Sequence, residues 1–529
     1  MALHRRRGRR RRSGARRLRG SERVYLAGGQ NIIARVCTKR GQDSSARVVS
    51  PYFLQSIQES CPLFVAEQVT KALSFLTFSA VLLQAKVRPL LLWSIAVVVV
   101  LLFIGHLVIV FPAKEFGFDY RIFWKVGRDV WAGHNPYAAE RFSEHPFLQP
   151  PSALPVFALF AVLPFGLSCA FWTAANVALC LLLPAYTQRT LKSQDDSSVG
   201  RIGNPSYAPC TQRTLQSQDD SSVGRIGNPS YAPWPLPLVA LAALTAALAV
   251  SDASLTALYT GQVSILATVF LLAALDAQAR GRPLLAGVWL ALATIKVGTM
   301  LPFLLLFLRK SDRAAWVSLS AVVLGLCLVT GHVSEFPDRL ASWLHHIDEL
   351  ALPGQVNDYS FQGTQHETIV GVDHALYRLG LRNRGGIRII QGLVLILLGC
   401  WVAREVLPRD RLPRAAACSL VALYAGLFLY HRIYDMVILV LPLVYSAARA
   451  QATTRWSRRL FLTCALAILL VLYLSKGLLR AILDHSFHWS DWGPFVQAAF
   501  LPAATWLILI AMFCLVAAER SGALDRSES

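Results

Sequence analysis

Charged residues are scarce in this chain. They make up 16% of its 529 residues, whereas 54% are hydrophobic. A composition this apolar excludes an ordinary water-soluble globular protein. Ten-residue segments that alternate between apolar and polar positions, the pattern of a membrane β-barrel, are also lacking. Apolar stretches of near-spanning length instead recur from residue 89 to residue 516. The sequence therefore predicts an all-α, polytopic membrane protein with about twelve transmembrane helices.

Cysteine patterning is absent as well. The ten cysteines form no CxxC pair and no spacing typical of a zinc site. Cys180, Cys327, Cys400 and Cys514 lie within apolar stretches, where a thiol acts as a small hydrophobic side chain. Acidic residues form no paired metal motif either. We therefore expect no metal and no cofactor.

Basic residues exceed acidic ones by 52 to 31, which gives a net charge of +21. In a membrane protein such an excess marks cytoplasmic loops rather than a nucleic-acid site. When the apolar stretches are threaded in turn, the basic clusters fall largely on one side. This sidedness is the internal check on the predicted topology. We therefore expect the lipid bilayer to be a partner of the chain, and we expect no nucleic-acid partner.

The ends of the chain differ from its middle. Residues 1–62 are predicted to be a basic, disordered cytoplasmic extension, because arginine dominates residues 5–12 and no apolar segment follows closely, as it would in a signal peptide. Residues 63–88 are predicted to form an amphipathic juxtamembrane helix. The transmembrane domain is predicted over 89–517, and a cytoplasmic tail over 518–529.

The threading makes five local predictions. The first span covers 89–110. Residues 150–162 are interrupted by prolines and too short for an easy span, so they are predicted to form an interfacial or re-entrant helix. The second span covers 167–186. Residues 251–261 are predicted to be a short external turn, and residues 331–386 a long external loop.

A tandem repeat interrupts the domain. Residues 187–209 read TQRTLKSQDDSSVGRIGNPSYAP, and residues 211–233 repeat them with one change, Lys192 against Gln216. Neither polar copy offers an evident apolar face to bury. The sequence therefore predicts that 187–233 is a flexible cytoplasmic loop insertion, and that deleting 187–210 leaves folding and activity nearly unchanged.

Unusual polar residues gather at the predicted external ends of the spans. They include Asp119, Gln262, Lys296, Asn357, Ser360, His431, Arg432 and Asp435. Ionisable groups near a membrane are costly and tend to mark a pathway or an active site. Each also has a simpler explanation: Lys296 could extend its amino group to the interface, and His431 could form a local ionic cap with Asp435. Their shared predicted face favours one functional site.

Five short motifs follow one another in this part of the chain. They are Asp119 with its following aromatic residues, the turn Gly133-His134-Asn135-Pro136-Tyr137, Gln149-Pro150-Pro151, Gly261-Gln262-Val263 with Gly287 to Lys296, and His431 to Asp435. Their order and spacing resemble glycosyltransferase family 87, the polyprenol-phosphate-mannose-dependent mannosyltransferases of the GT-C fold. The resemblance covers about residues 89–450, apart from the repeat. Gln149 departs from the family's tyrosine and Val297 from its proline, and 357–363 resembles its Asn-Gln-Ser-Leu segment only weakly.

The resemblance implies an integral membrane hexosyltransferase, in the first place a mannosyltransferase, at the external face of the cell membrane. It implies transfer from a polyprenyl-phosphate sugar donor to a glycan or glycolipid acceptor, with inversion and without a metal. Asp119 would be the general base, and Lys296, Arg432 and His431 would bind the donor phosphate. Substrate contacts would come from Tyr120, Arg121, Tyr137, Gln262, Asn357, Ser360 and Asp435.

Two other functions fit a chain of this composition. A lipid or solute transporter, or a flippase, would also have about twelve spans and intramembrane charges. It would more often show two related halves with broken helices at the midplane, and no half-to-half repeat is found here. An inactive transferase-like membrane scaffold is the third possibility.

Overall fold

The computed structural model describes residues 116–144, 146–199, 235–331, 333–360, 362–363, 369–408, 411–429, 431–453, 455–473, 500 and 502–527. The chain divides into two compact units, Met1–Cys61 and Pro62–Ser529, and all described residues belong to the second. The predicted basic extension, the juxtamembrane segment, the first span over 89–110 and the second repeat copy lie outside the described residues.

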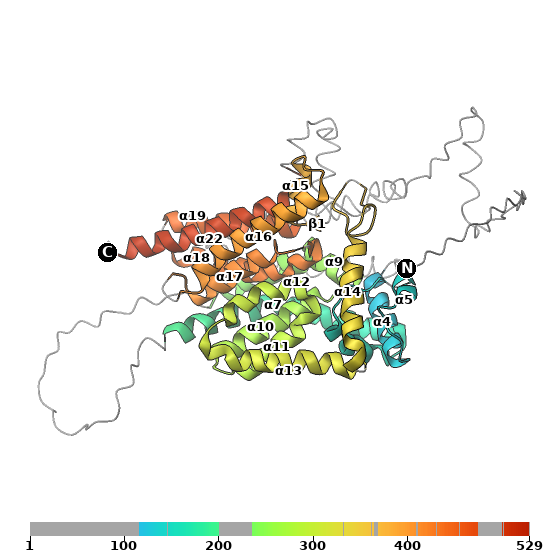
Figure 1. The fold of residues 1–529 in the computed structure, drawn as a ribbon. Coiled ribbons are helices and arrows are strands. Elements are labelled where there is room, and N and C mark those ends of the chain that lie inside the picture. The colour runs from blue at the N-terminus through green and yellow to red at the C-terminus, as the bar shows by residue number, and fades with distance from the viewer. Residues whose placement is uncertain are drawn as a thin grey trace, which may run out of the picture. The chain divides into compact units, whose positions relative to one another are not determined.

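Helices make up nearly all of the described structure (Figure 1). Backbone polar groups must be satisfied internally in a bilayer, and helices do this within one segment. Within the described ranges, seven helices are long and apolar enough to cross a membrane, or eight if one bent pair counts as a single span. The predicted all-α polytopic class is confirmed. The predicted number of about twelve spans is not reached in the described part of the chain.

The most buried helices lie in the C-terminal half. All residues of α17 (Arg414–Ala425) are buried, and nearly all of α18 (Val440–Ala452). Small residues in both helices allow close backbone approach, as is usual where membrane helices pack together. The helices α19 (Arg455–Tyr473) and α22 (Ala503–Ser527) pack against each other, and α18 packs against α19.

A second group of helices contains α10 (Ser264–Ala279), α11 (Pro283–Ala293) and α13 (Arg313–Val329), which pack side by side (Figure 1). After α11 the chain turns back through η2, α12 and η3. The carbonyl oxygens of Leu284 and Phe307 both accept hydrogen bonds from side chains in the first two turns of α13. The segment between them therefore leaves one end of the bundle and returns to it. The elements concerned are η2 (Thr294–Lys296), α12 (Val297–Met300), η3 (Leu301–Phe307) and η4 (Lys310–Asp312).

The helix α7 (Phe165–Val199) corrects the prediction for the repeat. It continues through residues 187–199, which the sequence assigned to a flexible loop. Thr187, Thr190, Leu191 and Gln194 follow helical spacing, and each is at most 1% exposed. The first copy therefore has a buried helical face, hidden from composition because most of its members are polar. The loop prediction is wrong for these residues.

Two other boundaries differ from prediction. Most of the predicted turn over 251–261 is the helix α9 (Asp252–Thr260), which Ser251 caps through its hydroxyl and which bends 53° from α8 (Leu238–Ala249). The predicted tail over 518–529 begins inside α22, because Glu519 is buried and bonded within the bundle.

Short elements gather at one end of the bundle. They are α4 (Phe118–Trp131), α5 (Ala139–Glu144), η1 (Pro151–Ala153), α6 (Leu154–Ala161), η5 (Val333–Glu335), α14 (Phe336–Leu350), β1 (Ile369–Val370), α15 (Val372–Arg378), β2 (His431–Arg432) and η7 (Ile433–Leu439). α14 runs across the end of α13 beside α4 and α5 (Figure 1). His346 of α14 bonds to the backbone oxygen of Tyr137 and stacks on Phe142 at 3.6 Å. The helix α16 (Arg384–Val406) then leads away from this end.

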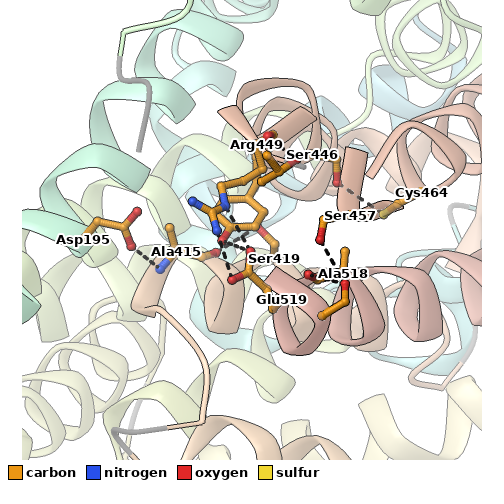
Figure 2. Close-up of polar contacts among 12 residues, drawn as sticks. Asp195, Ala415, Ser419, Ser446, Arg449, Ser457, Cys464, Ala518 and Glu519 are labelled. Atoms are coloured by element: carbon orange, nitrogen blue, oxygen red, sulfur yellow. Dashed lines mark hydrogen bonds and ion pairs between the residues drawn. The ribbon is translucent and has the colours of Figure 1, made fainter. Parts of the chain in front are cut away.

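Polar side chains join the helices at the opposite end. The Arg414 guanidinium donates to the Gln278 side-chain oxygen at 3.1 Å and to the Leu306 carbonyl at 2.5 Å. Asp195 of the first repeat copy accepts from the Ala415 backbone N–H at 3.1 Å, and Arg449 pairs with Glu519 at 3.1 Å (Figure 2). The repeat is thus fastened to the N-terminus of α17.

Candidate active site

A close backbone contact sets the position of Asp119. Gly261 has a φ of +77°, and a Cβ there would lie 2.5 Å from the Cβ of Tyr120. Only glycine accepts both the left-handed backbone and this approach. The Gly117 N–H also donates to the Tyr259 carbonyl at 2.8 Å. The first turn of α4 therefore rests directly on the connection between α9 and α10.

This contact brings Asp119 to Gln262. The Gln262 side-chain N–H donates to Asp119 Oδ2 at 2.5 Å. Burial raises the pKa of the Asp119 carboxyl above its ordinary value, while the Gln262 bond and then the charges of Arg432 and Lys296 oppose that rise. Asp119 is therefore a desolvated carboxylate close to two cations.

Lys296 and Asp435 form the centre of the second half of the site. Their ionic contact is 2.9 Å, with the lysine side chain 17% exposed and the aspartate side chain 4%. Ser264 donates to Asp435 Oδ1 at 2.7 Å, and the Arg432 backbone N–H donates to Oδ2 at 3.2 Å. The helical path breaks at Lys296, which has φ −129° and ψ 74°. The break lets a lysine from an apolar segment reach a buried carboxylate.

His431 and Arg432 are held by a two-residue ladder. Ile369 pairs with Arg432 and Val370 with His431, antiparallel. His431 Nδ1 lies 3.3 Å from Asp435 Oδ2, and its ring is 2% exposed. The Arg432 guanidinium donates to the Val356 carbonyl at 2.9 Å and to Asn357 Oδ1 at 3.3 Å.

The structure thus brings together six residues that the sequence singled out: Asp119, Gln262, Lys296, His431, Arg432 and Asp435, with Asn357 beside Arg432. They come from segments far apart in the chain. Among the described residues, His431 Nε2 and Gln262 Oε1 are buried without a hydrogen-bond partner.

Four other predicted substrate contacts have partners elsewhere. The Tyr120 hydroxyl bonds to Ser168, and its ring stacks on Trp172 at 5.1 Å. The Tyr137 hydroxyl donates to the Gln149 carbonyl at 2.7 Å. Arg121 lies over the Phe165 ring at 5.1 Å. Ser360 donates to Asp358 at 2.6 Å, in a loop that the Asp358–Arg384 ion pair also holds.

Comparison with known families decides the class of protein. The sequence model of glycosyltransferase family 87 matches residues 147–430, more than half of the 529 residues. The chain belongs to glycosyltransferase family 87. The curated proteins contain no match to it. This family 87 member is therefore a membrane glycosyltransferase, with a sugar donor and an acceptor as substrates.

The family match covers one part of the site only. Gln262, Lys296 and Asn357 lie within the matched residues, whereas Asp119 lies before them and Asp435 after them. The candidate site thus includes residues from outside the matched segment. Within the described ranges, no group of three or more His, Cys, Asp or Glu side chains is arranged to hold a metal ion.

Three site residues were missed by sequence reasoning. Thr260 adjoins Asp119 and donates its hydroxyl to the Thr256 carbonyl at 2.8 Å, Ser264 binds Asp435, and the Tyr434 ring lies 4.9 Å from Lys296 Nζ. Hydroxyl residues are frequent in membrane helices, so they stand out little. Their adjacency to the Gly261-Gln262 and His431–Asp435 motifs was the signal available.

Proposed function

We propose that this transferase moves a hexose, in the first place mannose, from a polyprenyl-phosphate donor to a hydroxyl of a glycan or glycolipid, with inversion. The observation that carries the proposal is the position of Asp119, a half-buried carboxylate that accepts the Gln262 bond at 2.5 Å and that the charges of Arg432 and Lys296 act upon. A base and cations for a leaving phosphate are the two requirements of such a transfer.

Asp119 takes the proton in the proposed reaction. The acceptor oxygen attacks C1 of the sugar while Asp119 removes the hydroxyl proton. The bond from C1 to the phosphate oxygen breaks, and the lipid phosphate leaves with the electron pair. A single displacement inverts C1, so a β-linked donor gives an α-linked product. Gln262 keeps the carboxylate oriented through its 2.5 Å bond.

Lys296, Arg432 and His431 stabilise the departing phosphate. Asp435 occupies one direction of the Lys296 ammonium, and the other N–H groups remain for phosphate oxygens. Asp435 then acts as the counter-ion that fixes the lysine before the substrate binds. Preorganised charges of this kind stabilise a transition state without moving during the reaction.

The external face of the cell membrane is the proposed side of the reaction. The other end of the bundle, where Arg414 meets Gln278 and Leu306, adjoins the basic connections after α10, η3 and α16. Basic connections favour the cytoplasmic side, so Asp119 faces outward. A polyprenyl tail in the bilayer then leaves its phosphate at the level of the site.

A paired assay tests the proposal. Purified wild type and Asp119→Asn are given a panel of polyprenyl-phosphate sugars and an acceptor extract. The variant keeps the size of the side chain but not its basicity, so turnover should fall roughly 10²–10⁴-fold with donor binding kept. A fully active variant removes Asp119 from this role. A wild type that transfers no sugar, but moves lipid or solute in liposomes, favours a transporter.

A further inference from the structure

The side-chain amide of Gln262 forms a hydrogen bond through its nitrogen but none through its oxygen among the described residues. Its side-chain N–H donates to Asp119 at 2.5 Å. The residue is 5% exposed, and its Oε1 is buried without a hydrogen-bond partner among the described residues. Buried polar atoms in proteins nearly always have a partner, so an unfilled one beside a reacting group requires an explanation.

The partner of Gln262 Oε1 must be a donor. An ionised Asp119 only accepts hydrogen bonds, so the amide must turn its nitrogen toward the carboxylate and its oxygen away. Phosphate oxygens are acceptors as well and cannot fill this position. The Lys296 ammonium pairs with Asp435 and its remaining N–H groups are assigned above to the donor phosphate, while the Arg432 guanidinium donates to Val356 and Asn357. An O–H group of a sugar has the required chemistry.

We propose that Gln262 is a specificity-determining residue whose Oε1 accepts a hydrogen bond from the acceptor hydroxyl next to the attacking one. This inference rests on the proposed function of Asp119. The amide carries both contacts on one rigid group, so Oε1 lies within a few ångströms of the carboxylate. Neighbouring hydroxyls on a sugar ring are similarly close. The site therefore takes an acceptor with a vicinal diol, and the acceptor is itself a sugar residue.

Gln278, near the C-terminal end of the helix α10 that Gln262 precedes, offers a matched control. Its side-chain nitrogen donates to the Leu306 carbonyl at 3.0 Å, and its oxygen accepts from Arg414 at 3.1 Å. Both of its polar atoms are thus bonded within the protein. Replacing Gln278 alters packing and stability but leaves substrate recognition untouched, which separates a structural defect from a loss of recognition.

The experiment compares acceptors that each lack one hydroxyl. With wild type, the deoxy acceptor that lacks the neighbouring hydroxyl should lose roughly 10–10²-fold in kcat/KM, as for a buried polar atom left unpaired. Gln262→Leu should lower activity with the full acceptor and abolish this discrimination. Gln262→Glu keeps an acceptor oxygen, so discrimination should persist, while its charge beside Asp119 should move the acid limb of the pH profile upward. Gln278→Leu should discriminate as wild type does.

Three outcomes overturn the inference. They are a wild type indifferent to every deoxy acceptor, a Gln262→Leu variant that still discriminates, and discrimination confined to deoxy donors. Each of these is measured on an active wild type, so the proposed function stands. A wild type without any transferase activity overturns the proposed function and the inference together.

Discussion

Two glutamines mark the two ends of α10, and they differ in how completely they are bonded. Gln262 precedes the helix and has an unfilled Oε1, whereas Gln278 near its other end is bonded through both side-chain atoms. Ser264 and Gln278 are separated by about 21 Å along the helix. Both ends bury charged groups, so buried charge alone does not distinguish a site from a structural junction. Unfilled hydrogen-bonding capacity does not do so alone either, because Thr187 and Thr190 in the repeat also have buried hydroxyls without a partner among the described residues; what is particular to Gln262 is that its unfilled atom belongs to the amide bonded to Asp119.

The structural end should show the largest effect on stability. Arg414 connects Gln194, Gln278 and the Leu306 carbonyl. Arg414→Gln removes the guanidinium that these neutral acceptors share, and each buried acceptor left without a partner typically costs about 1–3 kcal/mol. We expect a lower unfolding temperature in detergent with unchanged turnover per folded molecule. Reduced turnover in the folded fraction would show that the two ends are coupled.

At the end of the bundle that holds the candidate site, we expect the largest effect on turnover. Lys296→Gln keeps a hydrogen-bond donor for Asp435 but removes the positive charge. Loss of one preorganised electrostatic group should lower kcat roughly 10²–10³-fold and weaken donor binding, because a phosphate partner is lost in both ground and transition states. Steady-state kinetics and donor binding measure this. Unchanged donor affinity would contradict the proposed contact between Lys296 and the phosphate.

The pH dependence sharpens the comparison. Asp119 must be ionised to act as a base, and burial raises its pKa. The rate should therefore fall about tenfold per pH unit below that pKa, with a midpoint above the ordinary aspartate value of about 3.9. A raised pKa also means that ionised Asp119 opposes folding at neutral pH. Asp119→Asn should thus unfold no earlier than wild type, measured by thermal denaturation at pH 7.

We expect the smallest effect from substitutions at equivalent positions of the two repeat copies, which are also the most closely matched pair. Asp195 of the first copy accepts the Ala415 N–H, an N-terminal helix contact that typically contributes about 0.5–2 kcal/mol. Asp219 is the same residue in the second copy. Asp195→Ala should lower the unfolding temperature slightly, and Asp219→Ala should not. Equal effects of the two changes would show that the copies are not distinguished in this way.

A deletion tests whether the second repeat copy can replace the first when it is moved to the same place in the chain. Removing 187–210 joins Tyr186 to Thr211, so the second copy continues α7 with the same residues except for Gln216 in place of Lys192. Folding and activity should persist, now because the buried face is restored and not because it is dispensable. Removing both copies, 187–233, should abolish the folded fraction. Survival of that variant would show the contacts of Gln194 and Asp195 to be unnecessary.

The sequence predicted the fold class well because long apolar stretches have few alternatives in a membrane. It failed where a helix was built from polar residues: Thr187, Thr190 and Gln194 are buried, and hydropathy cannot detect such a face. The predicted turn over 251–261 failed for a related reason. Its residues are mixed in polarity, yet Ser251 caps a short helix there.

The assembly of the site was predictable, whereas the role of each side chain was not. Lys296 and Asp435 stood out because charges in apolar surroundings are rare, and the structure places them 2.9 Å apart. Tyr120 and Tyr137 stood out for their motif, yet both rings are 1% exposed and pack within the fold. Motifs give proximity to a site, but only three-dimensional contacts show which atoms remain open to a substrate.

Because Tyr120 packs directly against Gly261, the activity of the transferase depends on the absence of a side-chain carbon at residue 261. A methyl group at residue 261 would place its carbon 2.5 Å from the Cβ of Tyr120, which is too close for two carbon atoms. The helix α4 would be displaced, and Asp119 with it, while the spans would be free to assemble as before. Inherited or engineered loss of activity in a normally inserted chain should therefore map to this glycine, although it carries no reactive group.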